Sequence, residues 1–304
     1  MTRHEHITVC ICTFRRLKLL RRLLEALEKQ AANGFTFSCV VVDNDAAASA
    51  QTLAEEFRRR RNFEITYDIE SERNFAVVRN HAVRLATGDY IAFIDDDEVP
   101  VDGWLAELHA AMHRFNADGV LGPVRPAFDS DPPAWIKQGR LCERPAHPTG
   151  MELKWQQTRS GNVLLKKKIF DADKIQFDPA FRTGGEDVDF FRRAVKKGNR
   201  FVWCEEAAAY EWVSPERCRK SYFLKRALLQ GRISLKYATE KPTLGAQLQV
   251  GVKSAVAILG YTLMLPFLCF FGLGIVMKYL VKNCHHVGRL SALMGLPIGQ
   301  ERNF

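Results

Sequence analysis

Residues 88–100 (GDYIAFIDDDEVP) decide the fold of this 304-residue chain. Residues 90–94 form a short apolar run with β-branched and aromatic side chains, bounded by a glycine and by carboxylates, which is typical of a strand buried on both faces. Four acidic residues, 95–98, follow directly. Like charges this close repel one another unless a cation lies among them. The stretch therefore predicts a buried strand whose carboxyl end opens on a cation site.

A divalent metal is one candidate for this cation. Asp95 and Asp97 alternate along an extended backbone, so their side chains point to the same side, where a hard ion such as Mg²⁺ or Mn²⁺ can bridge them to a diphosphate. The alternative is that the carboxylates cap the helix expected after Pro100, although capping accounts for only one or two of them.

The composition limits the partners of the chain. With 47% hydrophobic residues, it can form one large α/β domain and a smaller appendage. The formal net charge of +9 favours an anionic partner: nucleic acid, a nucleotide diphosphate or a membrane surface. The eight cysteines lack zinc-ligand spacing, which is typical of reduced thiols in the cytoplasm. Residues 1–6 lead directly into an apolar run, so we expect no cleavable secretory signal.

Strand and helix patterns alternate in the first part of the chain. Strands are predicted at residues 7–14, 37–42, 65–67 and 90–94, and helices at residues 15–30, 46–61 and 74–87. This alternation predicts a mostly parallel sheet flanked by helices, and ligands bind beyond the carboxyl ends of its strands. The polar groups at those ends, where we expect a nucleotide, are residues 13–15 (TFR), 43–45 (DND) and 95–97 (DDD).

The next part of the chain has a weaker pattern. Residues 122–150 are rich in proline and glycine and are expected to form a long ordered loop. Residues 160–165 resume a strand. At residues 184–187 (GGED), two glycines permit a tight backbone turn and two carboxylates open a helix. Acidic residues at a helix start are frequently only caps, so the pattern by itself leaves their role open.

The order and spacing of these motifs resemble those of the family 2 glycosyltransferases. The resemblance extends to about residue 236 and rests on Thr-Phe and Asp-Asn at two strand ends, Arg79-Asn80, the acidic strand end with Pro100 and Trp104 after it, and Gly185-Glu186-Asp187. Residues 122–135 and 216–231 are also similar to the bacterial subgroup that builds exopolysaccharides, which includes succinoglycan-type glucosyltransferases.

The resemblance implies a GT-A (Rossmann-like) fold that binds a nucleotide-sugar, usually a UDP-sugar, and inverts the anomeric centre. It implies that Asp187 is the base for the acceptor hydroxyl, with Glu186 in support. A Mg²⁺ or Mn²⁺ cofactor is expected to stabilise the departing diphosphate, with the ligands Asp97, Asp95 and Glu211. The residues expected to contact the nucleotide-sugar are Thr13, Phe14, Arg15, Asp43, Asn44, Arg79, Asp95, Asp96 and Gly185.

The chain departs from the family pattern at two positions. Asn44 stands where many relatives have an acidic residue that accepts from the uracil N3–H; its amide oxygen can accept instead, or Asp43 takes that role. Glu211 stands near the place where some relatives have a metal-binding histidine. Either Glu211 replaces that histidine or the metal relies on Asp97 alone.

The C-terminal part of the chain predicts contact with a membrane. Basic and apolar residues interleave over residues 217–236, which suits a helix on an anionic membrane surface or a basic helix packed on the main domain. The 24 residues from 254 to 277 carry no charge and are long enough to cross a bilayer, as one span or as a re-entrant hairpin. The expected domains are residues 1–240, catalytic, and 241–304, membrane-associating.

The leading hypothesis is a glycosyltransferase at the cytoplasmic face of the bacterial inner membrane, which adds a sugar to a lipid-linked glycan. A nucleotidyltransferase would need a glycine-rich loop after the first strand, and residues 13–16 (TFRR) contain no glycine. A membrane-tethered nucleotide- or glycan-binding protein without transfer activity would need to have lost its base, yet Asp187 is present. Nucleic-acid binding is the least supported, because the positive charge clusters beside apolar, membrane-like sequence.

Overall fold

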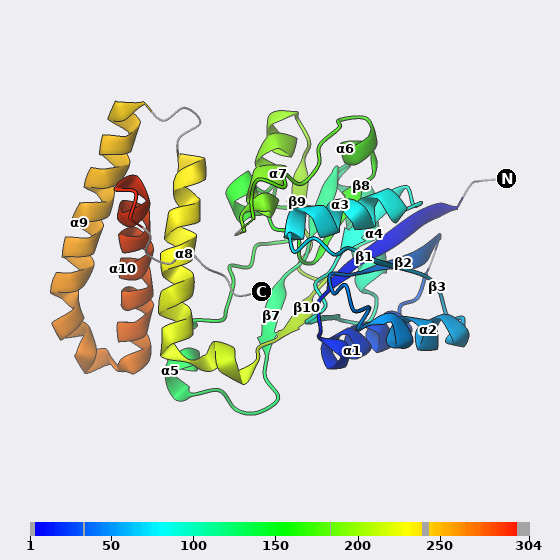
Figure 1. Cartoon of the computed structure of the whole chain (residues 1–304), viewed down its shortest axis with the longest axis horizontal. Helices are drawn as coiled ribbons and strands as arrows, with labels where there is room; N and C mark the ends of the chain where they lie inside the picture. The colour runs from blue at the N-terminus through cyan, green and yellow to red at the C-terminus, as the bar shows by residue number, and fades with distance from the viewer. Residues whose placement is uncertain (1–3, 33, 183, 239–242, 297–304) are drawn as a thin grey trace. The chain divides into compact units, whose positions relative to one another are not determined.

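The computed structural model describes residues 4–32, 34–182, 184–238 and 243–296 (Figure 1). The chain forms two compact units: Met1–Ala127 with Arg144–Trp212, and Phe128–Glu143 with Val213–Phe304. The domain boundary expected between residues 240 and 241 lies outside the described residues and stays a prediction.

The first unit is built on a seven-stranded sheet with the order β3-β2-β1-β4-β8-β6-β9 (Figure 1). Only β8 runs antiparallel to its neighbours; the other neighbouring pairs of this described sheet are parallel. This confirms the predicted mostly parallel α/β sheet. Its strands are β1 (Glu5–Thr13), β2 (Phe35–Asp43), β3 (Glu64–Ile69), β4 (Tyr90–Phe93), β6 (Gly119–Leu121), β8 (Val163–Lys166) and β9 (Phe201–Trp203).

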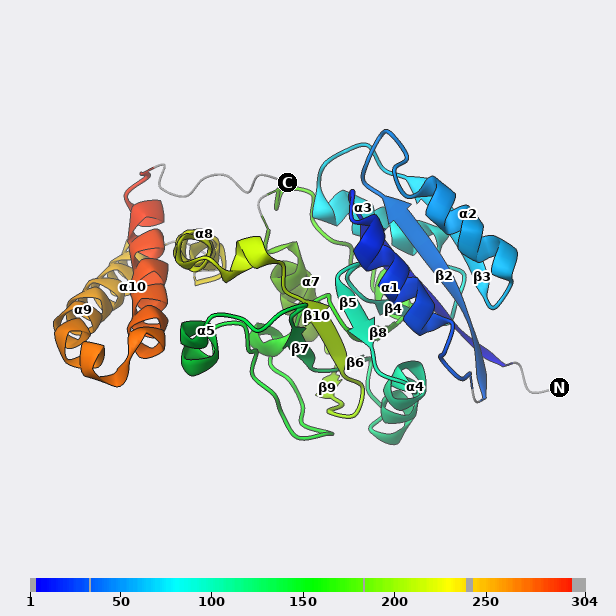
Figure 2. The ribbon, with the colours of Figure 1, turned by 90° about the horizontal axis from the view of Figure 1, so that it is seen from below.

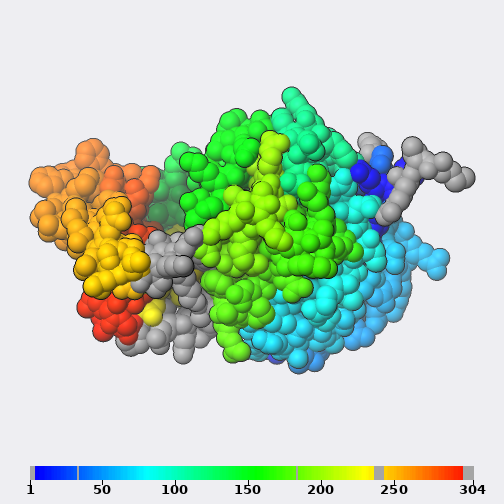
Figure 3. Space-filling model, turned by 90° about the horizontal axis from the view of Figure 1, so that it is seen from above, coloured from blue at the N-terminus to red at the C-terminus, as the bar shows by residue number. Residues whose placement is uncertain are grey.

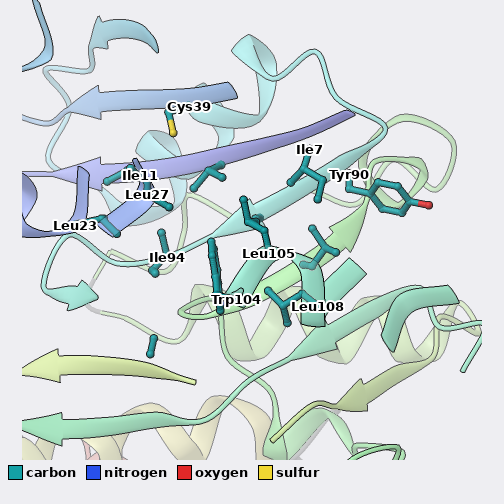
Figure 4. Packing of buried hydrophobic residues seen from close by; sticks show 14 of the residues in the cluster. Ile7, Ile11, Leu23, Leu27, Cys39, Tyr90, Ile94, Trp104, Leu105 and Leu108 are labelled. Carbon is teal, nitrogen blue, oxygen red and sulfur yellow. The ribbon is translucent and has the colours of Figure 1, made fainter. Parts of the chain in front are cut away.

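Helices cover both faces of this sheet, because successive side chains of each strand point to opposite faces. From β1, Ile7 and Ile11 join a buried cluster with residues of α1, α2 and α4, while Cys10 joins a second cluster with residues of α3, α6 and α7. Figure 4 shows the first cluster, in which Trp104 packs beside Ile94 and Leu105. The helices are α1 (Leu17–Leu27), α2 (Gln51–Arg60), α3 (Phe75–Leu85), α4 (Trp104–Arg114), α6 (Lys168–Asp171) and α7 (Glu186–Lys196), with a 3-10 turn at η1 (Trp155–Gln157).

A second, three-stranded sheet corrects the expectation that residues 122–150 form only a loop. Its order is β5-β10-β7, with β5 (Glu98–Pro100), β10 (Ala209–Trp212) and β7 (Val124–Ala127). The hydrogen-bond partner of β7 is β10, which is distant in sequence. Residues 134–139 also form a short helix, α5 (Ala134–Gly139).

The start of α2 also differs from the expectation, because the helix begins at Gln51 and not at residue 46. The Asp43 carboxylate accepts hydrogen bonds from the backbone N–H groups of Asp45 and Ala50, and Ala48 has a left-handed φ of 55°. Side chains of aspartate that bind nearby backbone in this way favour turns over helix.

The second unit contains a helical hairpin (Figure 2). The uncharged run is divided between α9 (Leu244–Leu268) and α10 (Leu273–Leu293), which pack together after a turn at Gly272 with φ of 96°. Gln138 of α5 holds this turn: its Nε2 donates to the carbonyl of Phe271, and its Oε1 accepts from the N–H of Gly274. The remaining elements are η2 (Pro215–Cys218), α8 (Lys220–Ala238) and η3 (Cys269–Phe271).

Within the described residues, one helical segment, Leu244–Phe271, is long and apolar enough to cross a membrane. Little of it is buried, and in the space-filling view α9 (orange) forms an open surface beside α10 (red) (Figure 3). The turn at Gly272 lies near the C-terminal end of the uncharged run, and both expected arrangements, one span or a re-entrant hairpin, stay predictions.

Asn162 joins the two sheets of the first unit. Its side chain is fully buried and its φ of 52° is left-handed. Its Nδ2 donates to the carbonyls of Pro123 and Ala207, both at 2.9 Å, and its Oδ1 accepts from Trp104 Nε1 at 2.6 Å. One amide thus satisfies three buried polar groups from three segments.

We expect Asn162→Ala to destabilise the protein by about 3 kcal/mol or more, because each buried polar group left without a partner costs about 1–3 kcal/mol. Urea unfolding of the full chain measures this change. The matched control is Asn62→Ala, which removes an exposed hydrogen bond to Glu28 and should change stability by less than about 0.5 kcal/mol. Equal effects of the two changes would contradict the role of Asn162.

Candidate functional site

The expected site lies where the strand order of the large sheet reverses. The chain builds outward from β1 through β2 to β3 and then returns to place β4 on the other side of β1, which is the usual ligand position in open α/β sheets. Thr13 ends β1, and its hydroxyl donates to Asp96 Oδ2 at 2.8 Å. The polar groups at residues 13–15 and 95–97, which the sequence predicted at neighbouring strand ends, are therefore in contact.

The acidic run after β4 separates into buried and exposed carboxylates. Asp96 and Asp97 are buried, and Arg16 Nη1 donates to both, at 2.9 Å and 3.2 Å. Burial raises the pKa of Asp96, against the opposing effects of Arg16 and Thr13. The Asp95 side chain is 47% exposed. Asp95 is thus the carboxylate of this run that is open to a ligand.

Arg79 of α3 connects the acidic run to the start of α7. Its Nη2 lies 3.8 Å from Asp95 Oδ1, and its Nη1 donates to Glu186 Oε1. Burial disfavours the charge of Arg79, but Glu186 and Asp95 outweigh burial and raise its pKa. The Oε2 atom of Glu186 is buried and has no hydrogen-bond partner in the described part of the chain. Two motifs about ninety residues apart are thus joined by one guanidinium.

Asp187 lies in the first turn of α7, beside this ion pair. Gly184 and Gly185 precede the helix with φ of 107° and 96°, values that favour glycine. Burial and the neighbouring Glu186 raise the pKa of Asp187 to about 6, although Arg79 opposes the shift. A carboxylate that titrates near neutral pH is suited to accept a proton from a hydroxyl group.

Asp43 and Asn44, two of the predicted site residues, lie at the end of β2 and differ in their hydrogen bonds. Both oxygens of the buried Asp43 accept hydrogen bonds from its own loop and from the Tyr67 hydroxyl. Asn44 Nδ2 donates to the carbonyls of Glu70 and Glu72 at 2.6 Å and 2.8 Å, so its Oδ1 faces away from these carbonyls.

Phe14 and Arg15 follow β1 on the same edge. Arg15 donates from Nε to Asp45 at 2.8 Å, and its guanidinium lies 5.1 Å from the centre of the Phe14 ring. Arg73 lies 4.8 Å from the same ring centre. Two guanidinium groups thus lie near this half-buried ring, and together they suit an anionic ligand with an aromatic group.

The three expected metal ligands do not form a compact cluster. Glu211 of β10 accepts an ion-pair hydrogen bond from Arg144, so its metal role stays a prediction. Among the described residues, the one group of three potential ligands with all ligand atoms within 4.8 Å lies elsewhere, at the amino end of β1. Asp95 and Asp97 nevertheless fit Mg²⁺ or Mn²⁺ in donor chemistry, because such ions commonly use one or two carboxylates plus phosphate oxygens.

Sequence reasoning missed four charged residues of this site. Arg16 pairs with two carboxylates of the acidic run, and the basic segment TFRR at residues 13–16 could have indicated it. Glu98 is fully buried; burial and Asp95 raise its pKa well above the usual range. Burial and the nearby Arg144 lower the pKa of Arg159 to about 10. No local pattern in the sequence distinguishes Arg144 or Arg159 from other arginines.

Residues 8–174 match the family model for glycosyl transferase family 2. The chain belongs to glycosyl transferase family 2. This confirms the resemblance drawn from the motifs and decides against a nucleotidyltransferase. The matched residues include most of β1, all of β2 and β4, and the acidic run, whereas Glu186 and Asp187 follow the matched range.

Three relatives extend this finding. The succinoglycan biosynthesis protein ExoM of Rhizobium meliloti (strain 1021) is 29% identical to this glycosyltransferase over 295 residues, which are 96% of this chain and 94% of ExoM. ExoW of the same strain is 26% identical over 63% of each protein. The crystal structure of S. aureus TarS 1–349 in complex with UDP-GlcNAc has a TM-score of 0.57 at 16% identity, over 96% of this chain and 92% of that chain. The last likeness confirms the GT-A-type fold.

We expect Arg79→Gln to destabilise this glycosyltransferase by about 3–5 kcal/mol near pH 7, because it leaves the buried Glu186 carboxylate without its cation. The loss should shrink as the pH falls, since protonation neutralises that carboxylate. Urea unfolding at two pH values measures both effects. Arg21→Gln is the control: Arg21 pairs with the exposed Glu56, and that change should cost less than about 1 kcal/mol. A pH-independent loss for Arg79→Gln would contradict the assignment.

Proposed function

We propose that this chain moves a sugar from a nucleotide-sugar, specifically a UDP-sugar, to a hydroxyl group of a lipid-linked glycan in bacterial surface polysaccharide synthesis. The names of ExoM and ExoW support the pathway class, and the UDP and UDP-GlcNAc complexes of TarS support the donor class. The observation that carries the proposal is the position of Arg79. Its guanidinium pairs both with Asp95, which we place on the side of the donor, and with Glu186, the neighbour of the proposed base Asp187.

The donor is proposed to lie along the carboxyl ends of β1, β2 and β4. Asn44 Oδ1 would accept from the uracil N3–H, and Phe14 with Arg15 would pack against the nucleoside. Asp43 then acts by holding the loop in place, since its oxygens are already occupied. Thr13 and Asp96 fix the floor of this edge through their mutual hydrogen bond, and Gly185 lets the backbone approach the sugar.

The diphosphate is proposed to face Asp95 and Asp97. A bound Mg²⁺ or Mn²⁺ would be held by these two residues and would offset the charge that develops on the leaving diphosphate. Arg16 pairs with Asp96 at 2.9 Å and with Asp97 at 3.2 Å, which offsets part of the repulsion between the two side chains. Glu211 remains a proposed further ligand, which it can become only if it leaves Arg144.

Asp187 is proposed to take the proton of the acceptor hydroxyl, on the side of the sugar opposite the diphosphate. Attack from that side inverts the anomeric centre in a single displacement, which needs one base and no covalent nucleophile. The neighbouring Glu186 raises the pKa of this base, and Glu186 is itself held by Arg79. Glu186 therefore positions and tunes the base.

The lipid-linked acceptor is proposed to place the enzyme at the cytoplasmic face of the inner membrane. One face of α9 carries a continuous apolar stripe whose side chains are each at least 60% exposed: Leu248, Val252, Val256, Leu259, Leu263 and Phe267. Their spacing of three or four residues aligns them on one side of the helix. Such a stripe is suited to contact lipid.

We expect Asp187→Asn to bind UDP-sugar normally but to lose sugar transfer by a factor of about 10²–10⁴, the usual contribution of a general base. Titration of binding and a transfer assay on the same folded protein test this, after a screen of UDP-, GDP- and TDP-sugars identifies the donor. Transfer within a few-fold of the parent would show that Asp187 is only a helix cap.

The pH profile supplies the control for this experiment. A base with a pKa of about 6 is ionised above that pH and loses activity below it. The parent protein should therefore show kcat/KM that rises with pH up to about 6 and then levels off. In Asp187→Asn that inflection should be absent.

We expect the double change Val256→Lys with Leu259→Lys to weaken membrane association strongly, because each charge costs on the order of 3 kcal/mol at the centre of a bilayer. Flotation with vesicles that contain anionic lipid measures the bound fraction. The control is Leu17→Lys, at an exposed apolar position on α1, which should leave flotation unchanged. Equal flotation of the double variant and the parent would remove α9 from the membrane contact.

A further inference from the structure

A second group of polar side chains lies at the opposite end of β1 from the donor edge. Glu5 is the first residue of β1 and Thr13 the last, so they are about 26 Å apart at the usual rise of a strand. His109 and His113 of α4 face Glu5 there. None of the three contributes to the sugar-transfer site described above.

Three ligand atoms converge in this group. Glu5 Oε2 lies 2.6 Å from His109 Nε2 and 2.9 Å from His113 Nε2, and the two nitrogens are 3.2 Å apart. A single proton can bridge only two of these atoms at a time. A metal ion, in contrast, accepts a lone pair from all three. The convergence of two imidazole nitrogens on one carboxylate oxygen therefore suits a shared cation.

The fold holds these ligands in place. His109 and His113 are four residues apart and so share one face of α4, where both rings contact the edge of Tyr90 at centroid distances of 5.6 Å and 6.2 Å. The Tyr90 hydroxyl donates to Glu5 Oε1 at 2.8 Å, and Figure 4 shows it directed away from Ile94 and the packed cluster. Such an outer partner orients a carboxylate toward a metal.

We propose that Glu5, His109 and His113 bind one Zn²⁺ ion, with water in the fourth position. Two imidazoles and a carboxylate are a common zinc ligand set, whereas Mg²⁺ prefers oxygen ligands alone. Tetrahedral zinc bonds of about 2.1 Å place ligand atoms about 3.4 Å apart, close to the 3.2 Å between the two nitrogens. Glu5 needs to move back by less than about 1 Å, and its 37% exposed side chain has room for this shift.

The ion would act as a structural clamp. It would tie the first residue of β1 to α4, two segments about a hundred residues apart in sequence. Since β1 lies between β2 and β4 in the sheet, fixing its start also fixes the strands on either side. Zinc binding should therefore raise the melting temperature of the protein.

The experiment measures zinc binding to the full chain in detergent, after removal of metal with a chelator and in excess Mg²⁺. We expect one Zn²⁺ per chain by equilibrium dialysis, and the absorption of four-coordinate Co²⁺ when cobalt replaces zinc. His113 is half exposed, so His113→Ala should stay folded, as judged by circular dichroism. It should lose zinc affinity at least about a hundredfold, while Tyr90→Phe should lose about 10–100-fold, as for an outer partner.

His81→Ala is the matched control. His81 also contacts two carboxylates, but through opposite ring nitrogens: Nδ1 faces Glu70 and Nε2 faces Asp68, so these groups cannot converge on one ion. Asp97→Asn is the control for the donor edge. Both variants should bind zinc as the parent does. The proposal is overturned if the parent binds no stoichiometric zinc, if His113→Ala binds it unchanged, or if Asp97→Asn abolishes it.

Discussion

The ion pairs of Arg79 join the acidic run after β4 to the start of α7. Asp95, Glu186 and Asp187 come from two segments that would repel each other in a partly buried space. Arg79 reaches both because α3 and α7 pack on the same face of the large sheet. The same guanidinium limits how far the pKa of Asp187 rises. The contact between these two segments and the pKa of Asp187 thus both depend on one side chain.

Arg16 is the second cation that contacts the acidic run. Arg16 pairs with the buried Asp96 and Asp97, while Asp95 remains open. The four adjacent carboxylates therefore have different partners: Asp96 accepts from Thr13 at the end of β1, and the fully buried Glu98 accepts from the backbone N–H of Asp95. An acidic run at a strand end is not a uniform ligand for metal. Its neighbours decide which oxygens reach the substrate.

The features that the sequence predicted well are local ones. The strand and helix periods of the first hundred residues and the acidic run are each contained in short segments, so the parallel sheet and the family followed from them. Contacts between distant segments were not predicted. Examples are the pairing of β7 with β10, the ion pair of Arg144 with Glu211 and the contact of Glu5 with His109. The spacing of apolar residues along the sequence carries no information about such contacts. The start of α2 was missed because a side chain, Asp43, competes with the helix for backbone N–H groups.

The antiparallel strand β8 has a consequence for synthesis of the chain. It pairs with β4 on one side and β6 on the other, yet its first residue, Val163, follows the last residue of β4, Phe93, by 163 − 93 = 70 residues. At typical translation speeds of about 5–20 residues per second, the edge of β4 waits about 4–14 s for its partner. An apolar strand edge exposed for that time invites pairing with other chains. Synthesis of residues 94–162 therefore separates the completion of β4 from the arrival of its partner β8.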